Sequence, residues 1–403
     1  MPYSVTDFAA GSQAIFHRTL PSEAFGLFEG RPKFWTRSGR QALRLLLGAL
    51  GLKQGSGVAV PLFTDPSLFS AIVAAGHRPV FVDVDPRYLT IDPQRLEDRR
   101  GAFSAVVAVH LFGQLAEMPA VFTGAGDVPV IEDSAHAPLS YLNGRMAGTL
   151  GAASFYSFAS TKYGPAGGGG LAVVNDAGLA LEMSDAIRSL SPSSRLEEMR
   201  NLALQAAKAV VFHRRVYGVC GRPVRRWVEK WALLEPCLDL KAIQRSWAAV
   251  ACRQAQRLPR RVEQQRANSL RLLARLGGLE DLGLPRERPG AQYNYHLFPV
   301  LLRSREERTA MMAAMWAKFV DTSMIYSGVV QEARRLGYEG GCPVAESAAD
   351  RLITLPNYAG LSGADIDYVA EVFLSSLLVC RHPGLKSVAP AELTPAGSTI
   401  QTD

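Results

Sequence analysis

The chain has 403 residues, of which 48% are hydrophobic and 20% are charged. These proportions are typical of a globular protein with room for more than one domain, and they exclude a small or intrinsically disordered chain. The five cysteines form no CxxC pair, so neither a zinc site nor a disulfide framework is indicated. Neither a secretory signal nor the roughly 18 consecutive apolar residues of a membrane-spanning helix can be found. We therefore expect a cytoplasmic protein.

The net charge of +7 is concentrated in one segment. Residues 200–230 hold eight Lys or Arg residues and one acid, so the rest of the chain is formally neutral. A local basic patch on a balanced protein indicates a docking surface or a solvated helical face, not a general polyanion binder. We therefore expect no nucleic-acid partner.

The first 175 residues alternate short apolar runs with helical stretches such as residues 65–76. The runs cover residues 58–63, 79–85, 105–112, 128–134, 152–158 and 170–175. Runs that are apolar on both faces are typical of strands in a sheet that is covered on both sides. Strands in alternation with helices predict a mostly parallel α/β sheet.

The second half of the chain has a different character. Residues 177–275 are mainly helical and rich in arginine, and a mixed segment from residue 293 ends in a helix near residues 365–380. We predict a large domain over residues 1–240 and a smaller α+β domain over residues 241–380. The Pro, Ser, Thr and Gly content of residues 381–403 predicts a disordered tail.

The run at residues 128–134 ends in Glu132 and Asp133, and His136 follows. Ligands of parallel α/β sheets bind beyond the carboxyl ends of the strands, so these residues are candidates for a site. An acidic pair can also cap a following helix, and for an isolated pair this interpretation would be favoured. Two further motifs change that balance.

Lys162 lies in a short polar turn between two predicted strands, and four glycines follow at residues 167–170. Most lysines lie on the surface, but glycine allows the backbone to approach a ligand closely. A lysine in a partly desolvated pocket loses proton affinity and becomes a nucleophile towards an aldehyde. Ser157 can donate a hydrogen bond to an anion, and Asp133 supplies an acid. Together with Lys162 they form the pattern expected for pyridoxal 5'-phosphate (PLP).

Ser38, Gly39 and Arg40 stand at the start of an apolar helix. The free N–H groups of such a helix start bind anions, and Arg40 could add a full positive charge. Alone, this motif predicts only a helix N-cap. Beside the other two motifs, it predicts a cradle for a phosphate group.

Together these motifs resemble those of the DegT-type (DegT/DnrJ/StrS) sugar aminotransferases, PLP enzymes of the aspartate aminotransferase fold (fold type I). The resemblance extends from about residue 30 to residue 375, and its motifs are "SGRQAL" (38–43), "EDSAHA" (132–137), "SFASTK" (157–162) and "GGGG" (167–170). It implies a mostly parallel seven-stranded sheet between helices, a smaller C-terminal α+β domain and a homodimer. It further implies amino transfer, with glutamate as the expected donor, to a keto-sugar, most often nucleotide-linked, for polysaccharide or natural-product glycan synthesis.

The resemblance also implies a role for each site residue. Lys162 would form the Schiff base with PLP and then move a proton, and Asp133 would keep the pyridine nitrogen protonated. His136 would lie beside the ring. The phosphate would be held by Ser157, Gly39 and Arg40.

The chain departs from the family pattern at several positions. Arg40 replaces a Thr, Gly168 replaces a Glu, and Asp65 stands where an aromatic residue normally stacks on the ring. The Asn-Tyr-Arg stretch that reaches the neighbouring subunit is not recognisable near Cys237. The identities of the ring-stacking residue and of the substrate therefore stay open. Tyr295, His296 and Tyr326 are candidates for contacts with the substrate.

Two alternatives to an aminotransferase follow from these departures. A PLP-dependent sugar dehydratase is disfavoured, because those relatives carry His at the position of Lys162. A regulator or scaffold that has lost activity would explain the departures. It is disfavoured because it would need neither a nucleophile nor an acid aligned with the nucleophile.

Residues 196–235 resemble an insertion relative to compact family members. The favoured interpretation is a solvated amphipathic helical hairpin that is broken at residues 218–223. The alternative is that its arginines and aromatic residues dock the enzyme on a membrane or a partner.

Overall fold

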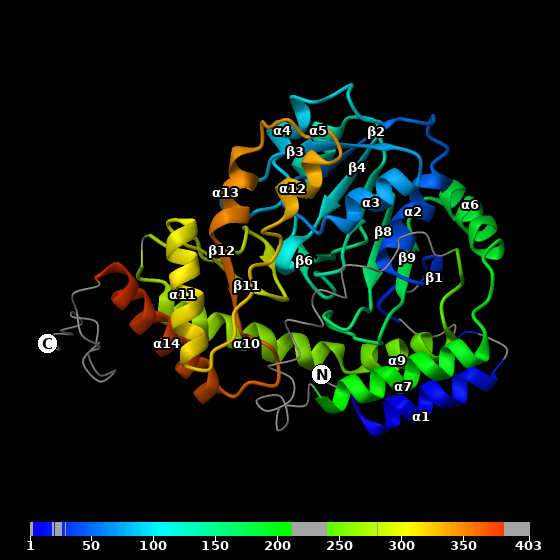
Figure 1. Ribbon diagram of the computed structural model, residues 1–403. Coiled ribbons are helices and arrows are strands. Elements are labelled where there is room, and N and C mark those ends of the chain that lie inside the picture. Colours follow the sequence, from blue (N-terminus) through cyan, green and yellow to red (C-terminus); the bar gives the residue numbers. More distant parts are fainter. Residues whose placement is uncertain are drawn as a thin grey trace, which may run out of the picture.

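The structure is a computed structural model that describes residues 3–17, 20, 26–28, 30–211, 240–279 and 281–382. Its centre is a seven-stranded sheet between helices (Figure 1). From edge to edge the strands are β1 (Lys33–Thr36), β9 (Gly170–Val174), β8 (Ala153–Ser157), β5 (Val130–Asp133), β4 (Ala105–Val109), β2 (Gly57–Pro61) and β3 (Arg78–Val82). The predicted fold class is confirmed, since β8, β5, β4, β2 and β3 run parallel.

Two antiparallel pairings complete the sheet at one edge. Strand β9 pairs antiparallel with β8, and β1, which the sequence pattern did not predict, pairs antiparallel with β9. A hairpin-like return between β8 and β9 places the segment with Lys162 at the carboxyl end of β8. This is the same edge of the sheet at which β5 ends in Asp133.

Side chains of each central strand alternate between two apolar layers. On β4, Ala105, Val107 and Val109 face one layer, while Val106 and Ala108 face the other. Both layers are fully covered, which explains why the strands carry no polar alternation.

Helices cover both faces of this sheet (Figure 1). One face is packed by α2 (Gly39–Ala49), α3 (Ser67–Ala74), α6 (Ala177–Arg188), α12 (Val329–Arg334) and α13 (Pro343–Arg351). The other face is packed by α4 (Pro93–Glu97), α5 (Met118–Ala125) and α9 (Arg245–Gln256). Short elements complete this part: η1 (Gly26–Phe28), η2 (Leu111–Gly113), β6 (Tyr141–Leu142), β7 (Arg145–Met146) and β10 (Ala291–Gln292).

A second, smaller core has the predicted α+β composition. The antiparallel pair β11 (Phe298–Leu301) and β12 (Leu352–Leu355) packs against three helices, α10 (Leu258–Leu276), α11 (Arg305–Ala317) and α14 (Gly363–Arg381). Although α12 and α13 lie within the sequence of this part, they pack on the large sheet. The division of the chain at residue 240 stays a prediction, and residues 383–403 of the predicted tail lie outside the described residues.

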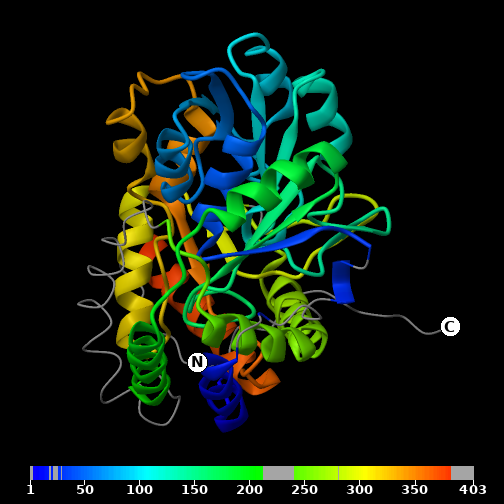
Figure 2. The ribbon, with the colours of Figure 1, turned by 90° about the vertical axis from the view of Figure 1, so that its right-hand side faces the viewer.

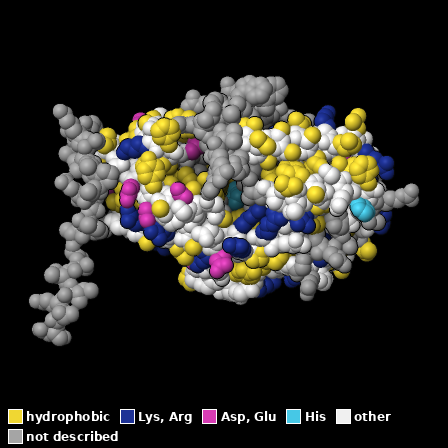
Figure 3. Space-filling model, turned by 90° about the horizontal axis from the view of Figure 1, so that it is seen from below, with side chains coloured by type: hydrophobic (Ala, Val, Ile, Leu, Met, Phe, Trp, Pro, Cys, Tyr) yellow, Lys and Arg dark blue, Asp and Glu magenta, His cyan; other side chains and the backbone are white. Residues whose placement is uncertain are grey.

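Below the sheet, α1 (Val5–Phe16), α7 (Arg195–Val211) and α9 lie side by side (Figures 1 and 2). Glu198 on α7 accepts hydrogen bonds from Arg245 and from the backbone of Ser246, so the first part of the predicted insertion is anchored. Viewed from this side, Lys and Arg side chains lie among hydrophobic ones (Figure 3). The predicted break at residues 218–223 and six of the eight basic residues lie outside the described residues. No helix in the described ranges has the length and apolarity to span a membrane.

Asp83, directly after β3, joins the sheet to the later part of the chain. Its buried carboxylate accepts hydrogen bonds from the backbone N–H groups of Val344 (3.1 Å) and Ala345 (2.8 Å) in the first turn of α13. A negative charge at a helix N-terminus is favoured by the helix dipole as well as by these bonds.

We predict that Asp83→Ala lowers the free energy of unfolding by about 1–3 kcal/mol, because buried N–H groups lose a charged acceptor. Urea unfolding monitored by circular dichroism measures this loss. Asp185→Ala, which removes an exposed carboxylate on α6, serves as the control and should change stability by less than about 1 kcal/mol. Equal losses in both variants would contradict the linking role of Asp83.

Candidate active site

Asp133, His136 and Lys162 lie together beyond the carboxyl ends of β5 and β8. The helix-capping interpretation of the acidic pair is wrong, because the residues after Asp133 form turns and no helix starts there. The Asp133 carboxylate accepts one hydrogen bond, from the backbone N–H of Ala135 (3.0 Å). The acid, the histidine and the lysine that the sequence grouped thus lie at one end of the sheet.

The neighbouring acid, Glu132, points to the opposite side of the strand and is structural. Its carboxylate accepts hydrogen bonds from the backbone of Gly148, Leu150 and Gly151 and from His110 Nε2. Burial raises the pKa of Glu132, but these hydrogen bonds outweigh burial and leave it below its usual value. Glu132 thereby fixes residues 148–151 and the end of β5.

The hydrogen bond between Lys162 Nζ and His136 Nε2 is 2.6 Å long. His136 Nδ1 accepts a hydrogen bond from the backbone N–H of Phe112 (3.3 Å), so a neutral ring carries its proton on Nε2. The Lys162 amine must then be the acceptor, which requires it to be neutral. Burial lowers the pKa of Lys162, opposed by the carboxylates of Asp65 and Asp133, and so favours this neutral form.

Burial also governs the other groups that titrate in the site. It raises the pKa of Asp133 to about 6, a shift that Ala135 N–H and Lys162 oppose and Asp65 reinforces. It lowers the pKa of His136 well below its usual value, helped by Lys162 and His296. Burial therefore disfavours the charged form of the amine, of the imidazole and of the carboxyl group alike.

His296 comes from the segment before β11 and contacts His136, with ring centroids 4.5 Å apart. Its pKa is lowered well below the usual value by burial and by Lys162. Tyr163 packs against His296 and donates a hydrogen bond to the backbone carbonyl of Asn294. The sequence offered His296 only as one of several candidate contacts, and nothing in it indicated Tyr163.

Aromatic side chains line the remaining side of the site. Phe112 lies parallel to both His136 and Tyr326, with ring centroids 6.3 Å apart in each pair. The backbones of Phe112 and Tyr326 have φ values of 59°, a left-handed conformation that bulky residues rarely adopt. Strand β4 therefore ends at Val109, although the apolar run of the sequence continues to residue 112. Such strain is typical of residues that a functional site holds in place.

The residues of the predicted phosphate cradle lie where α2 begins. Ser38 is the N-cap of α2, and its hydroxyl accepts the N–H of Gln41 at 3.1 Å. A Cβ added to Gly39 would lie 3.2 Å from Cβ of Ser157, so the end of β8 and the start of α2 are in close contact. Arg40 is half-buried in the first turn of the same helix.

Trp247 explains the glycine at position 168. A Cβ added to Gly168 would overlap the indole ring of Trp247, which extends from α9. The guanidinium of Arg37 also lies over this ring, 5.3 Å from its centroid. The tryptophan therefore occupies the space that a side chain at position 168 would need.

These residues fit PLP. The buried amine of Lys162, whose pKa is lowered, suits an aldehyde, the buried acid Asp133 suits a pyridinium nitrogen, and the start of α2 beside Ser157 suits a phosphate. The described residues include no group of three side chains arranged to bind a metal ion.

Comparisons with known proteins agree with this chemistry. The model of the DegT/DnrJ/EryC1/StrS aminotransferase family matches residues 34–374. A pleiotropic regulatory protein of Geobacillus stearothermophilus is 30% identical over 83% of this chain and 82% of its own. The UDP-N-acetyl-3-dehydro-alpha-D-glucosamine 3-aminotransferase of Acidithiobacillus ferrooxidans is 28% identical over 92% of this chain and 90% of its own. The structure of sugar aminotransferase CalS13 from Micromonospora echinospora has a similar fold, with a TM-score of 0.73 at 19% identity over 92% of this chain and 96% of its own.

We predict that Gly168→Ala costs about 1–3 kcal/mol of stability, because the ring of Trp247 must move to admit a methyl group. In a Trp247→Ala background the same change should cost less than about 0.5 kcal/mol, because the space is then open. The control is Gly164→Ala, whose added Cβ would meet its nearest neighbour at an ordinary 3.7 Å. A thermal-unfolding double-mutant cycle measures the coupling, and strictly additive losses would contradict it.

We predict that Asp133→Asn stabilises the ligand-free protein above pH 6. The raised pKa of Asp133, about 6, means that the folded state binds more protons than the unfolded state between about pH 4 and pH 6. Stability should therefore fall as the pH rises through this window, by up to about 3 kcal/mol, and the variant should escape that loss. Urea unfolding at several pH values measures the difference. If the stability of the variant changed with pH in the same way as that of the unmodified protein, the burial of an ionising carboxylate would be contradicted.

Proposed function

The chain belongs to the DegT/DnrJ/EryC1/StrS aminotransferase family, and from this premise we propose that it moves the amino group of glutamate onto a nucleotide-linked keto-sugar. It is a PLP-dependent sugar aminotransferase. The observation that carries the proposal is the short hydrogen bond between the buried amine of Lys162 and His136, beside the buried carboxyl group of Asp133. When bound, PLP supplies an electron sink that stabilises the carbanion formed during amino transfer.

Lys162 is proposed as the catalytic residue. Its amine would hold the cofactor covalently, and the same amine, when free, would carry the proton that moves at the substrate carbon. A lowered pKa suits both tasks, because the nucleophile and the base are the same uncharged group. His136 orients the amine by donating its Nε2 proton, and the backbone of Phe112 fixes the ring.

Asp133 is proposed to bind the ring nitrogen of the cofactor. In the buried pocket its carboxylate is costly to ionise, so a pyridinium partner would lower its pKa and be held protonated in return. Ser157, Gly39 and Arg40 are proposed to bind the phosphate. Arg40 replaces a hydroxyl of the family pattern by a full positive charge.

The nature of the substrate is supported by relatives. The enzyme from Acidithiobacillus ferrooxidans is named for a UDP-linked sugar, and other similar proteins are named for GDP- and dTDP-linked sugar products or substrates. A spore coat polysaccharide biosynthesis protein of Bacillus subtilis is 38% identical over 37% of this chain. We propose polysaccharide or natural-product glycan synthesis as the setting, with a cytoplasmic homodimer as the working form.

The regulator hypothesis keeps one specific support, the similarity to a pleiotropic regulatory protein. The two hypotheses differ in one half-reaction. An aminotransferase with bound PLP loses its visible absorbance when glutamate is added, and a panel of nucleotide-linked keto-sugars restores it. A regulator with bound PLP keeps the same absorbance in the presence of every amino donor.

We predict that Lys162→Ala abolishes the absorbance band of the Schiff base between the lysine and the cofactor and lowers amino transfer by at least about a thousandfold, because the variant loses both the nucleophile and the base. Lys53→Ala, which removes a lysine from the loop before β2, is the control and should match the unmodified protein. Absorbance spectra and a coupled glutamate assay provide the measurements. Unchanged spectra in Lys162→Ala would disprove the assignment of the catalytic lysine.

A further inference from the structure

The outward side of α7 is apolar, although this helix lies at the surface. The side chains of Leu196, Met199, Leu204 and Val210 are between 51% and 76% exposed. From Leu196 to Met199 is about one helical turn, and from Met199 to Val210 is about three, so these three residues form one stripe along α7. The stripe faces away from the apolar cores of the protein.

The inward side of the same helix is polar. Glu198 and Gln205 are only 1% and 4% exposed, and Glu198 is paired with Arg245 on α9. Surface helices of globular proteins normally bury their apolar side and expose their polar side. Because α7 has the reverse arrangement, its apolar stripe indicates a partner outside the protein's own core.

Helix α1 extends this apolar surface. Val5 and Phe16, near its two ends, are 85% and 65% exposed, and the Arg195 guanidinium at the start of α7 lies over the Phe16 ring, 6.0 Å from its centroid. We call the exposed residues of the two helices the α1–α7 face. Its apolar and charged members are Val5, Phe16, Arg195, Leu196, Met199, Arg200, Leu204, Lys208 and Val210.

The charge of the α1–α7 face has one sign. Arg195, Arg200 and Lys208 are all exposed. The acids of α1 and α7 are at most 15% exposed, and each is paired with a basic residue; they are Asp7, Glu197 and Glu198. Seen from below, Lys and Arg side chains again lie among hydrophobic ones (Figure 3).

This combination of charge and apolarity favours one kind of partner. A second copy of the chain that used the same face would bring Arg200 and Lys208 of both copies together without an acid between them. An anionic lipid surface instead offers phosphates to the basic residues and hydrocarbon to the apolar ones. The long stem of a lysine or arginine allows its charge to stay at the headgroups while neighbouring side chains lie deeper.

We propose that the α1–α7 face docks the protein on an anionic lipid surface. Leu196, Met199 and Val210 enter between the lipid headgroups, and Arg200 and Lys208 contact the lipid phosphates. The docking is peripheral and uses residues of α1 and α7, none of which belongs to the site around Lys162. The proposal therefore does not depend on amino transfer.

The first test is co-sedimentation of the full-length protein with vesicles made of equal parts of phosphatidylcholine and phosphatidylglycerol. We expect saturable binding that weakens as salt is added. Vesicles of phosphatidylcholine alone should bind at least about tenfold more weakly, because they carry no net charge. Absence of binding to the anionic vesicles would overturn the proposal.

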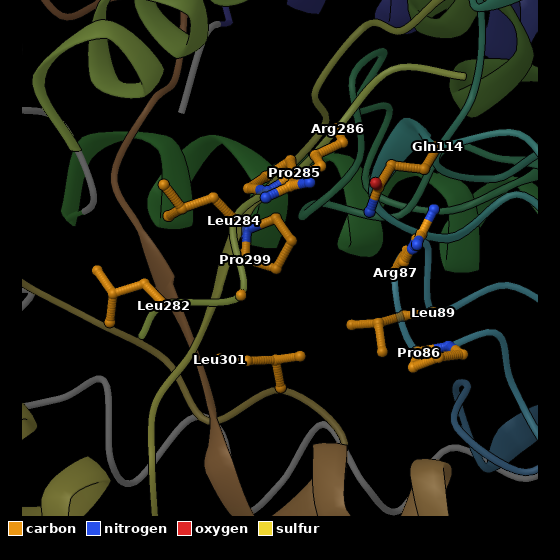
Figure 4. Close-up of a pocket in the computed structure, with 11 residues that line it drawn as sticks. Pro86, Arg87, Leu89, Gln114, Leu282, Leu284, Pro285, Arg286, Pro299 and Leu301 are labelled. Atoms are coloured by element: carbon orange, nitrogen blue, oxygen red, sulfur yellow. The ribbon is translucent and has the colours of Figure 1, made fainter. Parts of the chain in front are cut away.

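The Arg200→Gln, Lys208→Gln double variant tests the basic residues. It should weaken vesicle binding by about fivefold for each residue removed. The matched control is the Arg87→Gln, Arg286→Gln double variant, which removes the same charge. Both of these arginines are exposed, and they line a pocket to which neither α1 nor α7 contributes (Figure 4). Equal losses in the two double variants would mean that overall charge, and not the α1–α7 face, attracts the protein.

Leu196→Gln tests the apolar stripe. It should weaken vesicle binding by about tenfold, because a polar side chain gains nothing from hydrocarbon. Leu181→Gln on α6 is the matched control, since Leu181 is 72% exposed and Leu196 is 76% exposed, and it should bind normally. Both substitutions are at the surface, so both variants should keep the melting temperature of the unmodified protein.

Sedimentation velocity without lipid distinguishes a lipid surface from a second copy. The Leu196→Gln variant should sediment like the unmodified protein if lipid is the partner. A variant that dissociates into smaller species while it still binds vesicles would assign the face to an interface between copies and overturn the proposal.

Discussion

The chemistry proposed for this protein depends on one hydrogen bond, between the imidazole of His136 and the amine of Lys162. The backbone N–H of Phe112 determines which nitrogen of His136 carries the proton, and that proton in turn requires a neutral lysine. Burial acts in the same direction, because it penalises a charged ammonium. The strained turn at Phe112 therefore positions His136 in the proposed site, although the Phe112 side chain itself has no proposed chemical role.

Two adjacent acids show how local environment decides function. Glu132 and Asp133 follow one another on β5, so their side chains point to opposite faces. Glu132 receives four hydrogen bonds and stays ionised with a lowered pKa, whereas Asp133 receives one and has a raised pKa. The first holds the loop at residues 148–151 in place, and the second is left available for a ligand.

The strands and site residues that have a local sequence pattern could be predicted from the sequence. Apolar runs predicted six of the seven strands. The position of Asp133 at a strand end and that of Lys162 in a turn predicted that the two residues lie in one site. Contacts between distant segments could not be predicted, because no local signal reports them. His296 reaches His136 from beyond residue 290, and β1 is a partly exposed edge strand without a continuous apolar run.

Structure also changes the meaning of the departures from the family pattern. Taken as isolated substitutions, Gly168 and Asp65 suggest a site that has lost its function. Trp247 fills the space beside Gly168, so the loop stays packed without the usual side chain. Asp65 lies close enough to raise the pKa of both Asp133 and Lys162, so it adds a second carboxylate to the site. These two departures each have a physical counterpart nearby, which is expected when a working site is rebuilt for a different substrate and not when it decays.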